Sequence, residues 1–162
     1  MPHQSNPVRC LILACGNTLR GDDGVGPWLA AWAEEQFAAQ RAVRVISRHQ
    51  WTPDLAEDVA RAESVVFLDC AMDEKPGAVR VTSIHPASAQ AGVATHHLGA
   101  TELLALAEHL YSSLPRNALL LTIGAGSTEL GETFSQSVSD ALPGACDALE
   151  ATVLRLLANP GS

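Results

Sequence analysis

The first forty residues place an apolar run, a glycine-rich turn and a helical pattern in direct succession, and this order restricts the possible folds. Residues 8–14 are almost entirely apolar, which is typical of a strand that is buried on both faces. The turn that follows contains adjacent carboxylates, Asp22 and Asp23, and no lysine, and a helical pattern then occupies 25–39. In open α/β folds such a turn lies at the carboxyl ends of the strands, where ligands bind. Because it is acidic, we expect it to hold a cation rather than a phosphate.

The remaining sequence continues this alternation of strands and helices. We expect further strands over 42–47, 64–68, 79–84 and 118–123, and further helices over 53–62, 98–110 and 143–158. Pro143 should split a longer helical region that Ser135 caps, and Trp28 and Leu110 should face inward. The fourth strand follows a turn rather than a helix, so it should be antiparallel. The sequence therefore predicts a three-layer α/β sandwich with a mostly parallel, twisted five-stranded sheet and helices on both faces.

Length and composition indicate one domain over 1–162, with 1–7 as a loose N-terminal tail. The net charge is −8 and Lys75 is the only lysine, which argues against a nucleic-acid partner or an anionic membrane surface. No apolar run approaches the roughly 20 residues of a membrane helix, and 1–7 lacks the pattern of a signal peptide. The four cysteines form no C-x-x-C pair, so we expect them to be reduced, in the cytoplasm.

Three polar segments are expected to meet at the same edge of the sheet. They are the turn with Asp22 and Asp23, the end of the third strand at Asp69, and the doubled histidine His96 and His97 before a helix. Two carboxylates and an imidazole suit nickel, zinc, manganese or iron and leave coordination positions open. Asp69 is the least ordinary of these residues, because a carboxylate that ends an apolar strand loses solvation unless something compensates it.

Other interpretations of these residues remain open at this point. Either turn acid can instead cap the next helix or interact with its dipole, and a histidine before a helix is commonly a surface or capping residue. Cys15 or Cys70, with His96 as base, would make a nucleophile, although cysteines at strand ends usually serve packing. The glycines do not match G-x-G-x-x-G and the chain has no P-loop lysine, which disfavours a nucleotide site.

Three sequence blocks, in their order and spacing, resemble the hydrogenase maturation endopeptidase family. They are G-N-x-L-x-x-D-D-G-x-G over 16–26, F-L-D-C over 67–70 and H-H-L-G over 96–99. The resemblance extends from about Cys10 to the C-terminus; the first block is fairly specific, and the other two gain weight in combination. The chain departs from the family in two places: S-R-H-Q stands over 47–50 where many members have an aspartate and glycines, and Cys70 stands where alanine is common.

The resemblance implies a protease that cuts a short C-terminal extension from the large-subunit precursor of a nickel–iron hydrogenase after nickel has been inserted. It implies metal ligation by Asp23, Asp69 and His96, with His97 as a rival to His96, and a structural role for Asp22. The nickel would be carried by the precursor and would serve as the recognition element. Asp23 and Asp69 are also the first candidates for catalysis, and no H-E-x-x-H sequence competes with them.

Two other functions are alternatives to the protease. One is a nickel-binding assembly chaperone that does not cleave, since Asp23 stands where the family often has glutamate. The other is a small-ligand binding module that uses the glycine turn, which the acidic residues disfavour. The expected partner is the hydrogenase large-subunit precursor, and we expect a monomer because docking of a precursor needs a free face. The sequence leaves the particular hydrogenase open.

Overall fold

A five-stranded sheet lies at the centre of the computed structural model, which describes residues 8–88 and 98–159. Its strands, in chain order, are β1 (Cys10–Cys15), β2 (Val43–Arg48), β3 (Ser64–Ala71), β4 (Val79–Ser83) and β5 (Asn117–Gly124). In space their order is β2-β1-β3-β5-β4. All neighbouring pairs are parallel except β4 with β5, which confirms the predicted mostly parallel sheet and its antiparallel edge strand.

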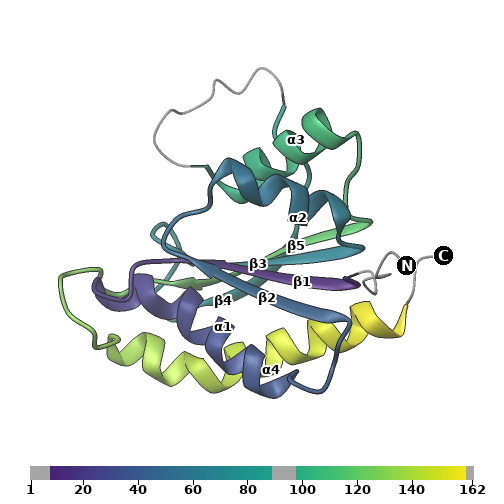
Figure 1. The fold of residues 1–162 in the computed structure, drawn as a ribbon. Coiled ribbons are helices and arrows are strands. Elements are labelled where there is room, and N and C mark those ends of the chain that lie inside the picture. The colour runs from purple at the N-terminus through teal and green to yellow at the C-terminus, as the bar shows by residue number, and fades with distance from the viewer. Residues whose placement is uncertain (1–7, 89–97, 160–162) are drawn as a thin grey trace.

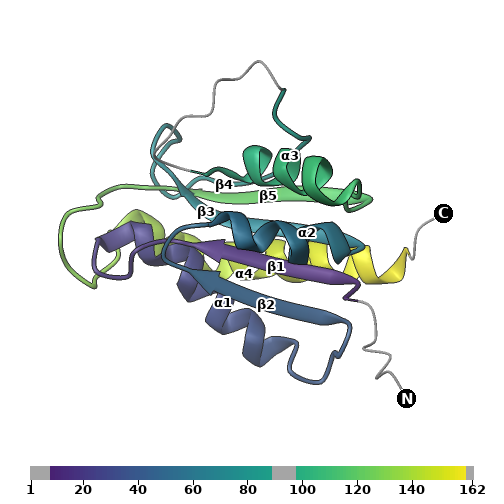
Figure 2. The same ribbon diagram turned by 45° about the horizontal axis from the view of Figure 1, so that its top comes forward.

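Helices cover both faces of this sheet, as predicted (Figure 1). On one face lie α1 (Val25–Gln36) and α4 (Gln136–Ala158), and on the other lie α2 (Ala56–Arg61) and α3 (Ala100–Tyr111). Figure 2 shows the same arrangement after rotation, with α2 in front of the sheet and α4 passing behind it. Two short 3-10 helices, η1 (Gly21–Gly24) and η2 (Pro53–Leu55), precede α1 and α2. None of the helices within the described ranges is both long and apolar enough to cross a bilayer.

The apolar side chains of β1 are divided between two cores, one on each face of the sheet. Ile12 belongs to the core under α1 and α4, whereas Leu11 and Leu13 belong to the core under α2 and α3. Successive strand residues point to opposite faces, so a strand that is covered on both sides needs apolar residues at every position. This explains why the N-terminal run is almost continuously apolar.

Two side chains that were expected to face inward are exposed instead. Trp28 is 39% exposed, because the buried stripe of α1 runs through Val25, Leu29 and Ala33 and Trp28 lies beside it. Leu110 is 55% exposed and lies in the last turn of α3, beyond its last buried residue, Ala107. Helical periodicity therefore predicted which face of each helix is buried, but not whether the residues at the edge of that face are buried or exposed.

Helix α4 is continuous, so the predicted break at Pro143 is wrong. The predicted cap is confirmed, since the Ser135 hydroxyl accepts a hydrogen bond from the Val138 N–H at 3.4 Å. Pro143 has no backbone N–H, so it cannot donate the hydrogen bond that the Ser139 carbonyl would accept in a regular α-helix. Both residues are exposed, so water can hydrate that carbonyl and the helix continues through the proline.

Replacing Pro143 with alanine is expected to raise the free energy of unfolding by about 1 kcal/mol, because alanine restores the missing N–H in an exposed helix interior. Urea unfolding followed by circular dichroism would measure the difference. Alanine at the neighbouring Gly144, which has no heavy atom near its Cβ position, is a matched control for helix propensity alone. A Pro143→Ala variant no more stable than the parent would show that the helix already compensates for the proline.

Candidate functional site

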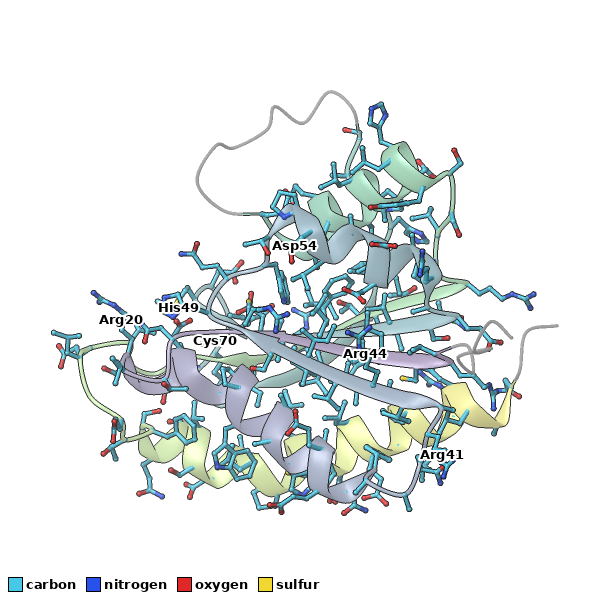
Figure 3. The ribbon with its side chains drawn as sticks, in the orientation of Figure 1. Arg20, Arg41, Arg44, His49, Asp54 and Cys70 are labelled. Carbon is cyan, nitrogen blue, oxygen red and sulfur yellow. The ribbon has the colours of Figure 1, made fainter. Side chains whose placement is uncertain are left out.

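A cleft of about 460 Å³ lies at the carboxyl ends of β1 and β3, beside the segment that follows β2. Figure 3 shows Arg20, His49 and Cys70 at this end of the sheet. The cleft is lined by Cys15, Gly16, Asn17, Arg20, Asp23, His49, Gln50, Trp51, Asp69, Cys70, Met72, Leu98 and Gly99. The first two sequence blocks, with Asp23 and Asp69, thus meet in one place, as the sequence predicted.

Asp23 lies in η1 and is held by the backbone of the preceding turn. Its Oδ2 accepts a hydrogen bond from the Asn17 N–H at 2.8 Å, and the Asn17 side chain accepts one from the Leu19 N–H at 2.9 Å. Gly16 is required here, because a Cβ on it would lie 1.9 Å from the Asp23 carbonyl oxygen. Among the described residues, the Asp23 Oδ1 has no hydrogen bond and remains available to a ligand.

Asp69 is partly buried near the end of β3, which extends to Ala71 rather than ending at 68. Its Oδ1 accepts a hydrogen bond from the Cys70 N–H at 2.8 Å. Burial raises the pKa of Asp69 to about 6, and the negative charge of Asp23 adds to that increase, while hydrogen bonds from the Cys70 N–H and the Cys15 thiol oppose it. In the described part of the chain, neither Asp23 nor Asp69 has an ion-pair partner. Two carboxylates that repel each other in one cleft are suited to bind a cation.

The two thiols of the cleft are poor candidates for a nucleophile. Burial raises the pKa of Cys70 to about 12, with contributions from the negative charges of Asp23 and Asp69. Burial and the nearby Asp69 carboxylate also raise the pKa of Cys15. Because the thiolate is the reactive form, these protonated thiols disfavour the cysteine-nucleophile alternative.

Asp22 is fully buried and is not among the residues that line the cleft, which agrees with the structural role expected for it. Its carboxylate accepts hydrogen bonds from the backbone N–H groups of Gly126 at 2.7 Å, Ser127 at 2.9 Å and Ser135 at 2.7 Å, and from the Ser135 hydroxyl at 2.7 Å. Burial alone would raise the pKa of Asp22, but these hydrogen bonds outweigh burial and hold that pKa below its ordinary value. Asp22 therefore ties the turn that carries Asp23 to the segment 126–135.

The predicted third ligand, His96, and its rival His97 lie outside the described residues. Leu98 and Gly99, the next residues of the chain, line the cleft. Within 8–88 and 98–159, no group of three or more His, Cys, Asp or Glu side chains is arranged to hold a metal ion. The structure thus places two of the three predicted ligands in one cleft, and the three-ligand set stays a prediction.

The cleft is also lined by Asn17, Arg20 and the segment 49–51, which were not predicted from the sequence to belong to the site. The place of the segment 49–51 in the chain could have indicated its role. It directly follows β2, at the same edge of the sheet as Asp23 and Asp69. Trp51 is buried, with its ring packed edge-to-face on Phe67 at a centroid distance of 5.1 Å. It belongs to the core and to the cleft wall at once.

No protein-family model and no curated protein matches the chain, but solved structures do. The hydrogenase maturating endopeptidase HybD from E. coli has a TM-score of 0.73 at 18% identity, over 91% of this chain and 93% of that one. The [NiFe] hydrogenase maturation protease HycI from Thermococcus kodakarensis has a TM-score of 0.64 at 23% identity, over 96% of each chain. These two likenesses show a shared fold.

A third structure is closer in sequence. The [NiFe] hydrogenase maturation protease HybD from Thermococcus kodakarensis is 26% identical and has a TM-score of 0.64, over 89% of this chain and 98% of that one. The shared fold spans nearly the whole of each chain, and the sequence blocks at 16–26 and 67–70 form the cleft in the structure. The shared fold and the position of these blocks thus agree with the sequence resemblance to the hydrogenase maturation endopeptidase family.

Proposed function

We propose that this protein is an endopeptidase that removes the C-terminal extension of a nickel–iron hydrogenase large-subunit precursor after nickel has been inserted. The observation that carries the proposal is the meeting of Asp23 and Asp69 in one cleft, without a cationic partner among the described residues. The similar solved structures named above, which are maturation endopeptidases and proteases, support it. The free cysteines agree with a cytoplasmic protein, and we propose that it acts as a monomer.

The nickel of the precursor would be recognised by Asp23 and Asp69, with His96 as the third ligand. Carboxylate and imidazole groups suit a borderline divalent ion, and three protein ligands leave positions for groups of the precursor. The raised pKa of Asp69 agrees with this assignment, because burial first and the charge of Asp23 second disfavour the ionised carboxylate, and a divalent cation would stabilise that ionised form. The precursor would thus supply the positive ion that the two carboxylates lack as a partner among the described residues, although Arg20 also lines the cleft.

The cleavage step would take place beside this nickel. Asp23 Oδ1 accepts no hydrogen bond within the described residues, and neither Asp23 nor Asp69 has an ion-pair partner there, so these carboxylates can ligate the ion or hold a water molecule next to it. The ion would polarise the scissile carbonyl or activate that water, whose oxygen would add to the carbonyl carbon while a proton of the water passes to the departing amine. The protonated cysteines would have no part in this step.

The alternative is a nickel-dependent assembly chaperone that does not cleave. The observation that favours it is the short side chain of Asp23, one oxygen of which is already bound by the Asn17 N–H. Only one oxygen is then free for a ligand, which permits binding of the precursor without productive placement of the peptide.

Mass spectrometry of a large-subunit precursor, incubated with this protein before and after nickel loading, would test the proposal. We expect a C-terminally shortened product from the nickel-loaded precursor alone. Shortening of both forms would retain the protease and contradict recognition through nickel. Stable binding of the nickel-loaded precursor without any change in mass would favour the chaperone.

A further inference from the structure

Three large apolar side chains are exposed around the cleft. Leu19 is 56% exposed, Met72 is 68% exposed and Leu130 is 79% exposed. These three residues form the apolar rim of the cleft. A single exposed apolar side chain is ordinary on a protein surface, whereas several that gather in one place indicate a surface that another molecule covers.

Two of the rim residues lie on loops that are hydrogen-bonded to each other. The Leu19 carbonyl accepts a hydrogen bond from the Gly131 N–H at 2.8 Å, and the Gly131 carbonyl accepts one from the Gly21 N–H at 2.7 Å. Leu130 directly precedes Gly131, so the loop between β1 and α1 and the loop between β5 and α4 present these leucines together. Figure 1 shows the two loops side by side at one end of the sheet. The rim is therefore held in place by the backbone before any partner binds.

A second hollow connects the rim to the cleft. It has a volume of about 550 Å³, and Arg20 and Met72 line both this hollow and the cleft, so the two adjoin at these residues. Its other wall is the segment 125–129, which directly precedes Leu130. Arginine and methionine are enriched in protein–protein interfaces. The cleft, the second hollow and the rim thus make one continuous surface.

This surface also extends to the other side of the turn that carries Asp23. A hollow of about 410 Å³ on that side is lined by Thr18, Gly24, Pro27, Trp28, Glu132 and Phe134. Trp28, which was expected to face inward, is thus part of an exposed wall. Shallow hollows on both sides of one turn suit a broad interface with a folded protein better than they suit a small ligand, which usually binds in one enclosed pocket.

The position of the rim identifies the part of the precursor that covers it. Asp23 Oδ2 accepts a hydrogen bond from the Asn17 N–H at 2.8 Å, and the Asn17 side chain accepts one from the Leu19 N–H at 2.9 Å. The rim and the proposed nickel ligand therefore belong to one hydrogen-bonded turn. Any part of the precursor whose nickel reaches Asp23 and Asp69 must come against this turn. That part is the body of the large subunit that holds the nickel, and not the extension that is removed.

We propose that the apolar rim is a docking surface for the nickel-bearing body of the large-subunit precursor. This inference rests on the proposed function, since it takes the precursor as the partner. The rim supplies affinity for the subunit through burial of apolar surface, whereas Asp23 and Asp69 recognise its nickel. Loss of a rim side chain therefore weakens binding and leaves the chemical step intact.

Leu19→Ser and Leu130→Ser test the inference, because each removes apolar surface at an exposed position where the fold tolerates a change. Each is expected to raise KM for the nickel-loaded precursor about fivefold to thirtyfold and to leave kcat within about twofold. If the precursor binds without being cleaved, its Kd is the readout and should rise by the same factor. Leu130→Met keeps an apolar side chain and should keep KM within about twofold of the wild-type value.

Leu110→Ser is the matched control. Leu110 is 55% exposed, much like Leu19, but it lies in the last turn of α3, near the amino end of β5 and far from the carboxyl ends of the strands. It should change neither constant. A synthetic peptide with the sequence of the extension should not inhibit processing at ten times the KM of the precursor, because the rim binds the body of the subunit.

Wild-type KM values in folded Leu19→Ser and Leu130→Ser, or an equal rise in Leu110→Ser, would overturn this inference and leave the proposed function standing. Inhibition by the extension peptide that Leu130→Ser relieves would assign the rim to the extension instead. A dimer of this protein, seen by sedimentation and lost in Leu130→Ser, would assign the rim to a second copy of the chain. Failure of the wild-type protein to bind or process nickel-loaded precursor would overturn both proposals.

Discussion

Asp69→Asn is expected to lower the rate of processing of the nickel-loaded precursor by at least about 100-fold, the largest effect on activity that the structure predicts. Asparagine keeps the shape of the side chain and its hydrogen bond from the Cys70 N–H, but it brings no negative charge to the ion. The reaction would be followed by the mass of the precursor over time, at saturating and at limiting concentrations of precursor.

The same substitution should make the metal-free protein more stable at neutral pH. The pKa of Asp69 is raised from 3.8 to about 6, first by burial, so the folded state binds its proton more tightly than the unfolded state. The contribution of this group to stability is therefore fully present below about pH 4 and is lost as the pH rises through about 6. Asparagine does not ionise, so the variant avoids this loss. We expect its free energy of unfolding to exceed that of the wild type by about 1–3 kcal/mol at pH 7 and to differ little from it at pH 4.

Opposite effects on activity and stability separate a binding role from structural damage. Asp147→Asn, an exposed aspartate on α4 and away from the cleft, is the matched control and should change neither quantity. Processing of precursor by Asp69→Asn at the wild-type rate would show that the nickel site is wrongly assigned. Slow processing together with lower stability would show that Asp69 acts through the fold.

The layered fold followed from the sequence because its determinants are local. Each central strand is an unbroken apolar run, and only a sheet covered on both faces can bury such a run. The sequence also predicted that Asp23 and Asp69 lie close together, because parallel strands bring their carboxyl ends to one edge of the sheet. Neither inference needed any knowledge of contacts between distant side chains.

The features of the fold and the cleft that the sequence did not predict depend on distant contacts or on solvent exposure, which no local sequence pattern encodes. Pro143 is tolerated within α4 because it faces solvent. The segment 49–51 joins the cleft because the chain passes over the sheet edge between β2 and η2. The partners of Asp22 lie 104 to 113 residues away in the sequence, so their identity depends on how the segment 126–135 returns to the first turn.

Asp22→Asn is expected to lower the free energy of unfolding by about 3–5 kcal/mol at pH 7, the largest effect on stability among these predictions. The Asp22 carboxylate is the shared acceptor of four donors in a fully buried place. An amide at the same position would turn an N–H₂ group toward some of these donors, leaving them without an acceptor and adding a buried donor that has no partner. Urea unfolding of the variant and of Asp147→Asn, the exposed control, would measure the difference.

The pH dependence of this loss distinguishes an ionised Asp22 from a residue that merely fills space. Its pKa is lowered in the folded state, so its contribution to stability is present above the ordinary carboxyl pKa of 3.8 and is lost as the pH falls through the lower, folded value. The gap between wild type and Asp22→Asn should therefore be widest near neutral pH and should narrow in acid. A gap of constant size from neutral to acidic pH would mean that shape rather than charge holds the turn. In that case the position of Asp23 would not depend on the charge of its neighbour.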